Sequence, residues 1–257
     1  PLPLWKLATA YAAFVEIWEG FAHGQEGQDR FFSRMVWRSV ASMIISQGRA
    51  YIFVHIPKTG GTSLALALES RAMKDDILIG DTPKAAKRRR RFKDAKAAGR
   101  LWKHSTLADI DGLVSVEQID QAFTVTMVRN PWDRVVSFYH WLRAQRFDDV
   151  SVHTAQKTDF PGFLRSDYLQ KALPANPYGH YMTRSDGVED CSLYLQLERF
   201  ETDAAQLWEH LGFRLELPAV NRSDRPGDYR ILYTDSDAEI VAKLCRDDIA
   251  RFGYQFS

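Results

Sequence analysis

The chain has little cysteine, no long apolar run and almost no excess of charge. Only two of its 257 residues are cysteine, Cys191 and Cys245, and the sequence has no C-x-x-C pair or His/Cys cluster. This sparse usage argues against a disulfide framework and gives no reason to expect a metal site. Because 45% of the residues are hydrophobic, a chain of this length can bury a large core without cross-links.

No segment has the roughly 18 consecutive apolar residues that a membrane-spanning helix needs. The apolar residues near the N-terminus are interrupted by Lys6, Glu16 and Glu19, which does not fit a signal peptide. We therefore expect no membrane span and a cytoplasmic location. The formal net charge of +1 gives no general reason to expect a nucleic-acid partner.

The most informative stretch is YIFVHIPKTGGTS at residues 51–63, where an apolar run changes into a loop with two glycines and one lysine. Val, Ile and Phe favour a buried parallel strand, and Gly60 and Gly61 permit backbone conformations that other residues avoid. Residues 64–69 then have a helical composition. Unpaired N–H groups at that helix N-terminus, with Lys58, Thr62 and Ser63, predict a site for a phosphate or sulfate group.

This loop differs from the nucleotide-binding pattern G-x-x-x-x-G-K-[ST] in the position of its lysine. In that pattern the lysine follows the last glycine, whereas Lys58 precedes Gly60 and Gly61. The ammonium group must therefore approach the anion from the strand side of the loop, which suggests a different nucleotide chemistry.

A second apolar run, at residues 123–128, leads into RNPWDRVVSFY at residues 129–139. Its polar residues also follow the end of a predicted strand. Ligands of open α/β sheets bind beyond the carboxyl ends of the strands, so we expect the two turns to line one pocket. Arg129 would bind a phosphate with two parallel N–H groups, and Ser137, about two helical turns later, would add a hydroxyl.

These two stretches resemble the sulfotransferase superfamily that uses 3'-phosphoadenosine 5'-phosphosulfate (PAPS). They are most similar to its carbohydrate branch of membrane-associated and bacterial enzymes. Residues 56–63 resemble the family's 5'-phosphosulfate loop and residues 128–139 its 3'-phosphate motif, while the C-terminal stretches 221–230 and 247–254 are similar to the same branch. The resemblance covers roughly residues 43 to 257 and implies one sulfotransferase domain there.

The resemblance implies in-line transfer of a sulfuryl group from PAPS to a hydroxyl, and we expect this hydroxyl to belong to a carbohydrate. Lys58 would meet the negative charge that grows on the bridging oxygen to the 5'-phosphate. Arg129 and Ser137 would bind the 3'-phosphate. The 5'-phosphate and sulfuryl oxygens would be bound by backbone and hydroxyl groups of Thr59, Gly60, Gly61, Thr62 and Ser63. The resemblance also indicates a bacterial cytoplasmic enzyme, or alternatively the lumenal domain of a Golgi enzyme whose anchor was removed.

An alcohol needs a base, and histidine suits that task because its unperturbed pKa lies near neutrality. Of the seven histidines, His104 lies between the two motifs, where relatives of this branch often carry a catalytic histidine. We therefore predict His104 as the base, with His140, three residues past Ser137, as the alternative. We interpret His55 as a satisfied core residue.

A basic run follows the first motif and has three interpretations. We favour a solvated helix face. The second interpretation is that the run steers an anionic acceptor, such as an acidic polysaccharide, and the third is that it binds nucleic acid. The run contains Lys84, Lys87, Arg88, Arg89, Arg90, Arg91, Lys93 and Lys96.

Two other functions compete with sulfuryl transfer. A nucleotide-dependent kinase or phosphotransferase would use Mg²⁺, and the position of Lys58 argues against it. A nucleic-acid-binding module would use the basic run at residues 84–96. In a purely structural alternative, Arg129 and Ser137 anchor a helix through a salt bridge and a cap.

The order of the remaining elements predicts an α/β fold. We expect a P-loop-like parallel sheet with helices on both faces, in a single domain with a helical N-terminal extension over residues 1–42. The extension has apolar residues at helical spacing and would pack on the core or on a second subunit; an interfacial membrane helix is a weaker alternative. Residues 147–187 are rich in proline and aromatics and suit an acceptor-binding region. We also predict a strand at 193–197, a helix at 203–211 that ends at Gly212, and a last helix that opens at Thr234 and ends at Gly253.

Overall fold

The strand before the glycine loop lies in the middle of a five-stranded sheet whose order is β3-β1-β2-β4-β5. The computed structural model describes residues 40–218 and 225–256, so nearly all of the predicted extension at 1–42 lies outside the described residues. The strands are β1 (Ser42–Ser46), β2 (Tyr51–Val54), β3 (Ile77–Gly80), β4 (Phe123–Val128) and β5 (Leu193–Gln196).

The α/β class is confirmed, but the sheet is mixed. Strands β2, β4 and β5 pair in parallel, as predicted, whereas β1 pairs antiparallel with both β2 and β3. The expectation of a wholly parallel sheet was therefore wrong for β1. The reason is the short turn at residues 47–50, closed by a 3.1 Å hydrogen bond from the Ala50 N–H to the Gln47 carbonyl. So short a connection permits only an antiparallel pair.

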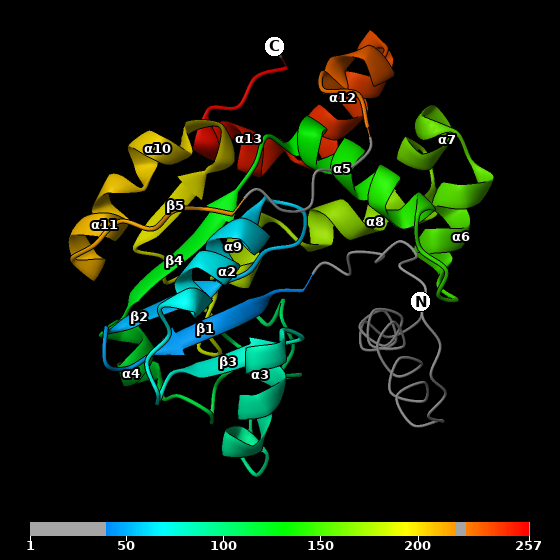
Figure 1. The fold of residues 1–257 in the computed structure, drawn as a ribbon. Helices are drawn as coiled ribbons and strands as arrows, with labels where there is room; N and C mark the ends of the chain where they lie inside the picture. Colours follow the sequence, from blue (N-terminus) through cyan, green and yellow to red (C-terminus); the bar gives the residue numbers. More distant parts are fainter. Residues whose placement is uncertain (1–39, 219–224, 257) are drawn as a thin grey trace, which may run out of the picture.

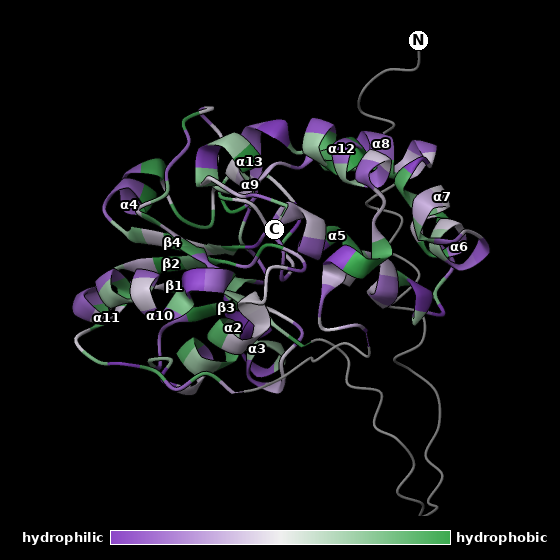
Figure 2. Cartoon of the chain, turned by 90° about the horizontal axis from the view of Figure 1, so that it is seen from above, coloured by the Kyte–Doolittle hydropathy of each residue, from purple (hydrophilic) through white to green (hydrophobic). Residues whose placement is uncertain are grey.

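Two layers of helices enclose the sheet, as Figure 1 and Figure 2 show. Side chains alternate along β2, because Tyr51 and Phe53 pack with helix α2 on one face while Ile52 and Val54 pack with helix α5 on the other. The helices are α2 (Gly61–Ser70), α3 (Pro83–Arg88), η2 (Arg89–Phe92), α4 (Val116–Asp120), α5 (Pro131–Arg143), α6 (Val150–Lys157), α7 (Phe160–Leu164), α8 (Asp167–Ala175), α9 (Tyr178–Tyr181), η3 (Leu197–Arg199), α10 (Phe200–Asp203), α11 (Ala205–Leu211), η4 (Tyr229–Leu232), α12 (Asp235–Leu244) and α13 (Arg246–Phe252).

Several local predictions are confirmed. Thr234 and Asp237 form a capping box at the start of α12, and Gly212 and Gly253 end their helices with φ values of 76° and 67°. The predicted last helix is two helices, because the chain leaves helical geometry at Cys245, where φ is −113°. The region 147–187 contains four short helices, α6 to α9.

No helix of the described residues is long and apolar enough to cross a membrane.

Candidate functional site

The glycine loop connects the carboxyl end of β2 to the N-terminus of α2 in a conformation that depends on its sequence. Lys58 has φ +66° and Gly60 has φ +85°, both in the left-handed region that favours glycine. A Cβ at Gly60 would lie 2.8 Å from Leu197 Cδ1, and one at Gly61 would lie 2.7 Å from His55 Cδ2. The two glycines therefore let the loop pack against Leu197 of η3 and against His55, just after β2, at distances that side chains would prevent.

The N-terminus of α2 has neither a side-chain cap nor an acidic residue in its first turn. The first N–H groups of a helix have no partner within the helix, and the helix dipole makes this end favourable for an anion. The Thr59 hydroxyl is buried and donates to the Ile56 carbonyl at 2.9 Å. Thr59 therefore shapes the loop with its hydroxyl and has only its N–H group left for an anion.

Lys58 points from this loop toward helix α5, and its ammonium lies 5.4 Å from the ring centroid of Trp141. Burial first, and then the nearby cations Arg129, Arg225 and Lys103, lower the pKa of Lys58 to about 7. A half-buried ammonium among like charges is stabilised by an anion. Lys58 thus has the electrostatic properties of a phosphate or sulfate ligand.

Arg129 connects the second motif to the first. Its Nη1 donates to the Lys58 carbonyl at 3.4 Å, and its Nε and Nη2 donate to Asp133, with 2.8 Å between Nε and Oδ2. Arg225 donates to the other oxygen of Asp133 at 2.6 Å. Asp133 therefore lies between two arginines, and the three side chains together keep a positive charge. The salt bridge of the structural alternative is present, but a single carboxylate does not neutralise both guanidinium groups.

Ser137 is buried on α5, one turn after Asp133 and one turn before Trp141. Residues four apart share a helix face, so Ser137 lies on the face that carries the partners of Arg129 and Lys58. The structure thus brings Lys58, Arg129 and the face of Ser137 together at the carboxyl edge of the sheet.

His104 is fixed beside the loop by a hydrogen bond and by aromatic contacts. Its Nδ1 lies 2.8 Å from the His55 carbonyl oxygen, its ring stacks on that of His55 at 4.7 Å between centroids, and Trp102 meets it edge-on at 4.8 Å. Because a carbonyl only accepts, Nδ1 must carry the proton, which leaves Nε2 as the basic nitrogen of the neutral ring. Burial, with His55 and Lys103 nearby, holds the pKa of His104 well below its usual value.

The interpretation of His55 as a satisfied core residue was wrong in one respect. His55 follows β2 and is only 3% exposed, but its Nδ1 has no hydrogen-bond partner. Burial lowers the pKa of His55 to about 3, so its ring is neutral. His140, the alternative base, lies on α5 with its ring edge-on to Tyr139 at 5.5 Å between centroids.

The sulfotransferase family profile matches residues 42–255. The chain belongs to the sulfotransferase family. No curated protein sequence matches it. Among solved structures it is similar to mouse sulfotransferase SULT7A1 complexed with PAP, with 14% identity, a TM-score of 0.43, and coverage of 78% of this chain and 84% of that chain. The predicted family and enzyme class are confirmed.

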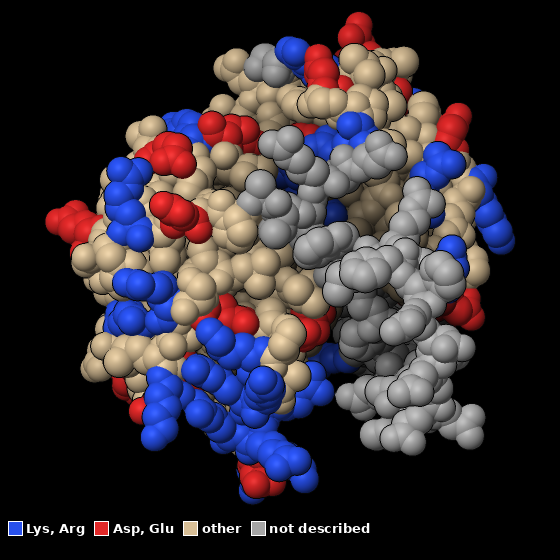
Figure 3. Space-filling model, in the orientation of Figure 1, with Lys and Arg blue, Asp and Glu red and all other residues tan. Residues whose placement is uncertain are grey.

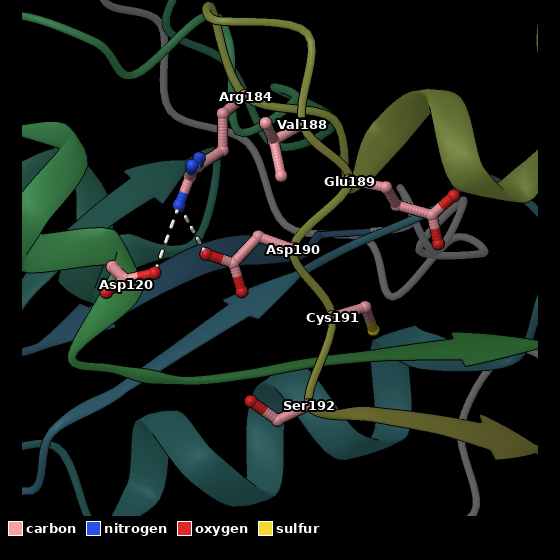
Figure 4. Close-up of a pocket in the computed structure, with 7 residues that line it drawn as sticks. All are labelled: Asp120, Arg184, Val188, Glu189, Asp190, Cys191 and Ser192. Carbon is pink, nitrogen blue, oxygen red and sulfur yellow. Dashed lines mark hydrogen bonds and ion pairs between the residues drawn. The ribbon is translucent and has the colours of Figure 1, made fainter.

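Two cavities lie at opposite ends of the sheet of this sulfotransferase. One, of about 340 Å³, lies at the carboxyl ends of β4 and β5 and includes Asp133. The other, of about 410 Å³, lies before the start of β5 (Figure 4). There Arg184 faces Asp120 at 3.3 Å and Asp190 at 3.1 Å. This arginine is already paired with carboxylates, so the second cavity does not favour an anion.

Four side chains of the candidate site were not predicted from the sequence. They are Lys103, Asp133, Trp141 and Arg225. Arg129 and Asp133 are four residues apart at the start of a predicted helix, and this spacing predicts an ion pair. Arg225 lies 92 residues from Asp133, and no local pattern connects them. Within residues 40–218 and 225–256, no group of three or more His, Cys, Asp or Glu side chains is placed to hold a metal ion.

Proposed function

We propose that this sulfotransferase transfers the sulfuryl group of PAPS to a hydroxyl of a carbohydrate acceptor. The observation that carries the proposal is the contact between Arg129 Nη1 and the Lys58 carbonyl, which joins the two anion-binding motifs at one edge of the sheet. PAPS has a phosphate group at each end of its ribose, and the two motifs offer a cationic group for each.

The donor set fits this cofactor. Lys58, the N-terminus of α2 and the hydroxyls of Thr62 and Ser63 would hold the 5'-phosphosulfate, and Arg129 with Ser137 would hold the 3'-phosphate. Arg225 shares Asp133 with Arg129 and would add a second guanidinium there. When bound, PAPS supplies an activated sulfuryl group on a phosphate leaving group. Pairing of buried guanidinium groups with the 3'-phosphate would select PAPS over a nucleotide that lacks it.

Lys58 would stabilise the charge on the leaving oxygen. Its amine group has a pKa near neutrality in the free protein, and an adjacent phosphosulfate would favour the charged form. An ammonium held at developing charge, away from water, lowers the energy of the transition state more than that of the ground state.

His104 would take the proton of the acceptor hydroxyl at Nε2. The hydrogen bond from Nδ1 to the His55 carbonyl holds the ring in the required tautomer. The low pKa of His104 in the free protein would rise beside the anionic cofactor, because negative charge favours the imidazolium that proton transfer creates.

The acceptor is proposed to be an anionic carbohydrate because of the basic surface on α3 and η2. Side chains of this surface gather on the lower part of the face in Figure 3. They are the exposed residues Lys87, Arg89, Arg90, Arg91, Lys93 and Lys96, with Asp94 between them.

One ion pair lies between the start of α3 and the proposed base. Asp81 immediately precedes Thr82, the N-cap of α3, and pairs with Lys103 at 2.7 Å, next to His104 in the chain. An acidic polysaccharide drawn to α3 would therefore arrive beside the base. Nucleic acid fits less well, because Phe92 is the single aromatic residue within the run 84–96.

Thermal stabilisation by nucleotides tests the cofactor assignment. At a concentration a hundredfold above its Kd, 3',5'-adenosine bisphosphate should raise the free energy of unfolding by about 2.7 kcal/mol without Mg²⁺. ADP and 5'-AMP at the same concentration should raise it less. Preference for ADP with Mg²⁺ would instead indicate a phosphotransferase. A lack of response to all three nucleotides would contradict the proposed cofactor site.

Charge reversal tests acceptor steering. The double variant Arg90→Glu/Lys93→Glu should raise the acceptor KM at low salt, and the effect should shrink as salt screens the charges. The matched control is Lys243→Glu/Arg246→Glu, which changes the charge equally on α12 and α13, away from α3 in Figure 1. Equal KM values for the two variants would exclude steering by the basic surface. The bacterial cytoplasmic setting and a homo-oligomer through residues 1–42 stay predictions.

A further inference from the structure

Four half-buried aromatic side chains form a connected row, and the Lys58 ammonium lies over one of its two inner members, Trp141. Trp141 lies 6.3 Å from Phe138 and 6.1 Å from Phe147 between ring centroids, and Phe138 lies 6.5 Å from Tyr168. None of these rings is fully buried, although each packs against the core. We call this set, Trp141, Phe138, Phe147 and Tyr168, the aromatic row.

The aromatic row passes beside Lys58 at Trp141. The Lys58 ammonium lies over Trp141, and Ser137 precedes Trp141 by one turn of α5. Helix α5 runs from the carboxyl end of β4 toward α6, α7 and α8 (Figure 1), and Tyr168 belongs to α8. A group seated on Trp141 would therefore lie beside the ammonium that is assigned to the leaving oxygen.

We propose that the aromatic row is the acceptor subsite, in which a sugar ring stacks on Trp141 and presents one hydroxyl toward Lys58 and His104. The inference rests on the proposed function, which assigns residues to the cofactor and to proton transfer, and it adds a residue that contacts the acceptor. A sugar ring has apolar C–H faces and a polar rim of hydroxyls. A half-buried indole can cover one such face while the rim stays hydrated.

Two observations favour a carbohydrate over an aryl or lipid acceptor. The side chains of the aromatic row are only partly buried, whereas an aryl or lipid acceptor favours an enclosed apolar cavity. The two cavities at the ends of the sheet have mainly polar side chains and include no member of the aromatic row. In addition, the exposed Arg143 and Arg146 follow Trp141 closely in the chain, which gives the segment after Trp141 the positive charge that an acidic sugar requires.

Calorimetric titration of the whole chain tests the subsite. The probe is a tetrasaccharide of alternating glucuronate and N-acetylglucosamine, added with saturating 3',5'-adenosine bisphosphate, and 4-nitrophenol is the aryl comparison. Trp141→Ala should weaken tetrasaccharide binding about tenfold or more, and Trp141→Phe should retain most of it because a smaller ring still stacks.

Phe213→Ala is the matched control. Phe213 is also half-buried with cations over its ring, Arg49 at 5.4 Å and Arg71 at 4.9 Å, but it follows α11, away from α5 in Figure 1. This variant should bind the tetrasaccharide like the parent chain. Cooperative thermal unfolding of Trp141→Ala serves as the check that the variant is folded.

Three results would overturn the inference. They are unchanged tetrasaccharide binding by Trp141→Ala, no tetrasaccharide binding by the parent chain although the bisphosphate binds, or binding of 4-nitrophenol in its place. Failure of the parent chain to bind the bisphosphate would count against the proposed function instead, so the two failures are distinguishable.

Discussion

The Nδ1 of His104 donates to the backbone carbonyl of His55 over 2.8 Å, and the two imidazole rings stack with 4.7 Å between their centroids. The residue just after β2 thus positions a histidine that comes 49 residues later in the chain. This contact fixes both the place of the His104 ring and the nitrogen that is available as a base, and it supports the first prediction.

We expect His104→Ala to lower kcat about 10²- to 10⁴-fold, the range that general-base catalysis contributes, while 3',5'-adenosine bisphosphate binds as before. Steady-state kinetics with a hydroxyl acceptor and calorimetry with the bisphosphate measure the two effects separately. His140→Ala is the control and should retain near-normal turnover. If His140→Ala loses turnover and His104→Ala does not, the base is His140.

Lys58→Ala should lose rate mainly in kcat, by about 10²- to 10³-fold, because the ammonium acts most strongly on charge that develops in the transition state. Lys58→Arg should recover part of the rate, since it restores the charge with different geometry. The measurement is kcat against KM for PAPS. A variant that raised KM and left kcat intact would limit Lys58 to cofactor binding.

Arg129→Ala should weaken binding of 3',5'-adenosine bisphosphate much more than binding of 5'-AMP, because Arg129 is assigned to the 3'-phosphate alone. Loss of a charge-assisted pair of this kind costs about 2–5 kcal/mol. Arg246→Ala, which removes an exposed arginine paired with Asp247 at 3.2 Å, is the control and should leave both affinities unchanged. Equal loss for the two nucleotides would remove Arg129 from the 3'-phosphate site.

Affinity for the bisphosphate should fall as the pH rises above 7. The pKa of Lys58 is lowered to about 7 in the free protein, so above this pH the lysine is neutral and must take up a proton when an anion binds. The Kd of the bisphosphate should then rise up to about tenfold per pH unit between pH 7 and the pKa that Lys58 has in the complex. Lys58→Arg, whose charge is permanent, should abolish this slope. A flat profile in the parent chain would mean that Lys58 is not linked to anion binding.

Gly60→Ala should destabilise the fold more than Gly187→Ala, although both glycines have a positive φ, +85° and +83°. The left-handed conformation costs either alanine about 1–2 kcal/mol. A Cβ at Gly187 meets nothing within 4 Å, whereas at Gly60 it would lie 2.8 Å from Leu197 Cδ1. Overpacking of this kind adds about 1–3 kcal/mol. Urea unfolding measures the difference, and Gly60→Ala/Leu197→Ala should recover the part due to the clash. Equal destabilisation by the two single variants would show that the Leu197 side chain moves away from the added Cβ without a loss of stability.

Local sequence patterns were enough to predict the two strand–loop–helix units and the helix ends at Thr234, Gly212 and Gly253, and they selected Lys58 and Arg129 as candidate anion ligands. These features depend on residues close together in the chain, where backbone preference and side-chain chemistry act directly. For the same reason the parallel pairing of β2 with β4 was predictable from their alternation with helices.

Which distant side chains meet at the candidate site depends on tertiary packing. Strand β1 runs antiparallel to β2, and Asp133 lies between Arg129 and Arg225. The Lys58 ammonium lies over Trp141, and His55 Nδ1 is buried without a hydrogen bond. Each of these outcomes depends on packing between segments that are far apart in the sequence. No periodicity or motif of one segment encodes such packing, because the shape of the partner surface forms only when the sheet is assembled.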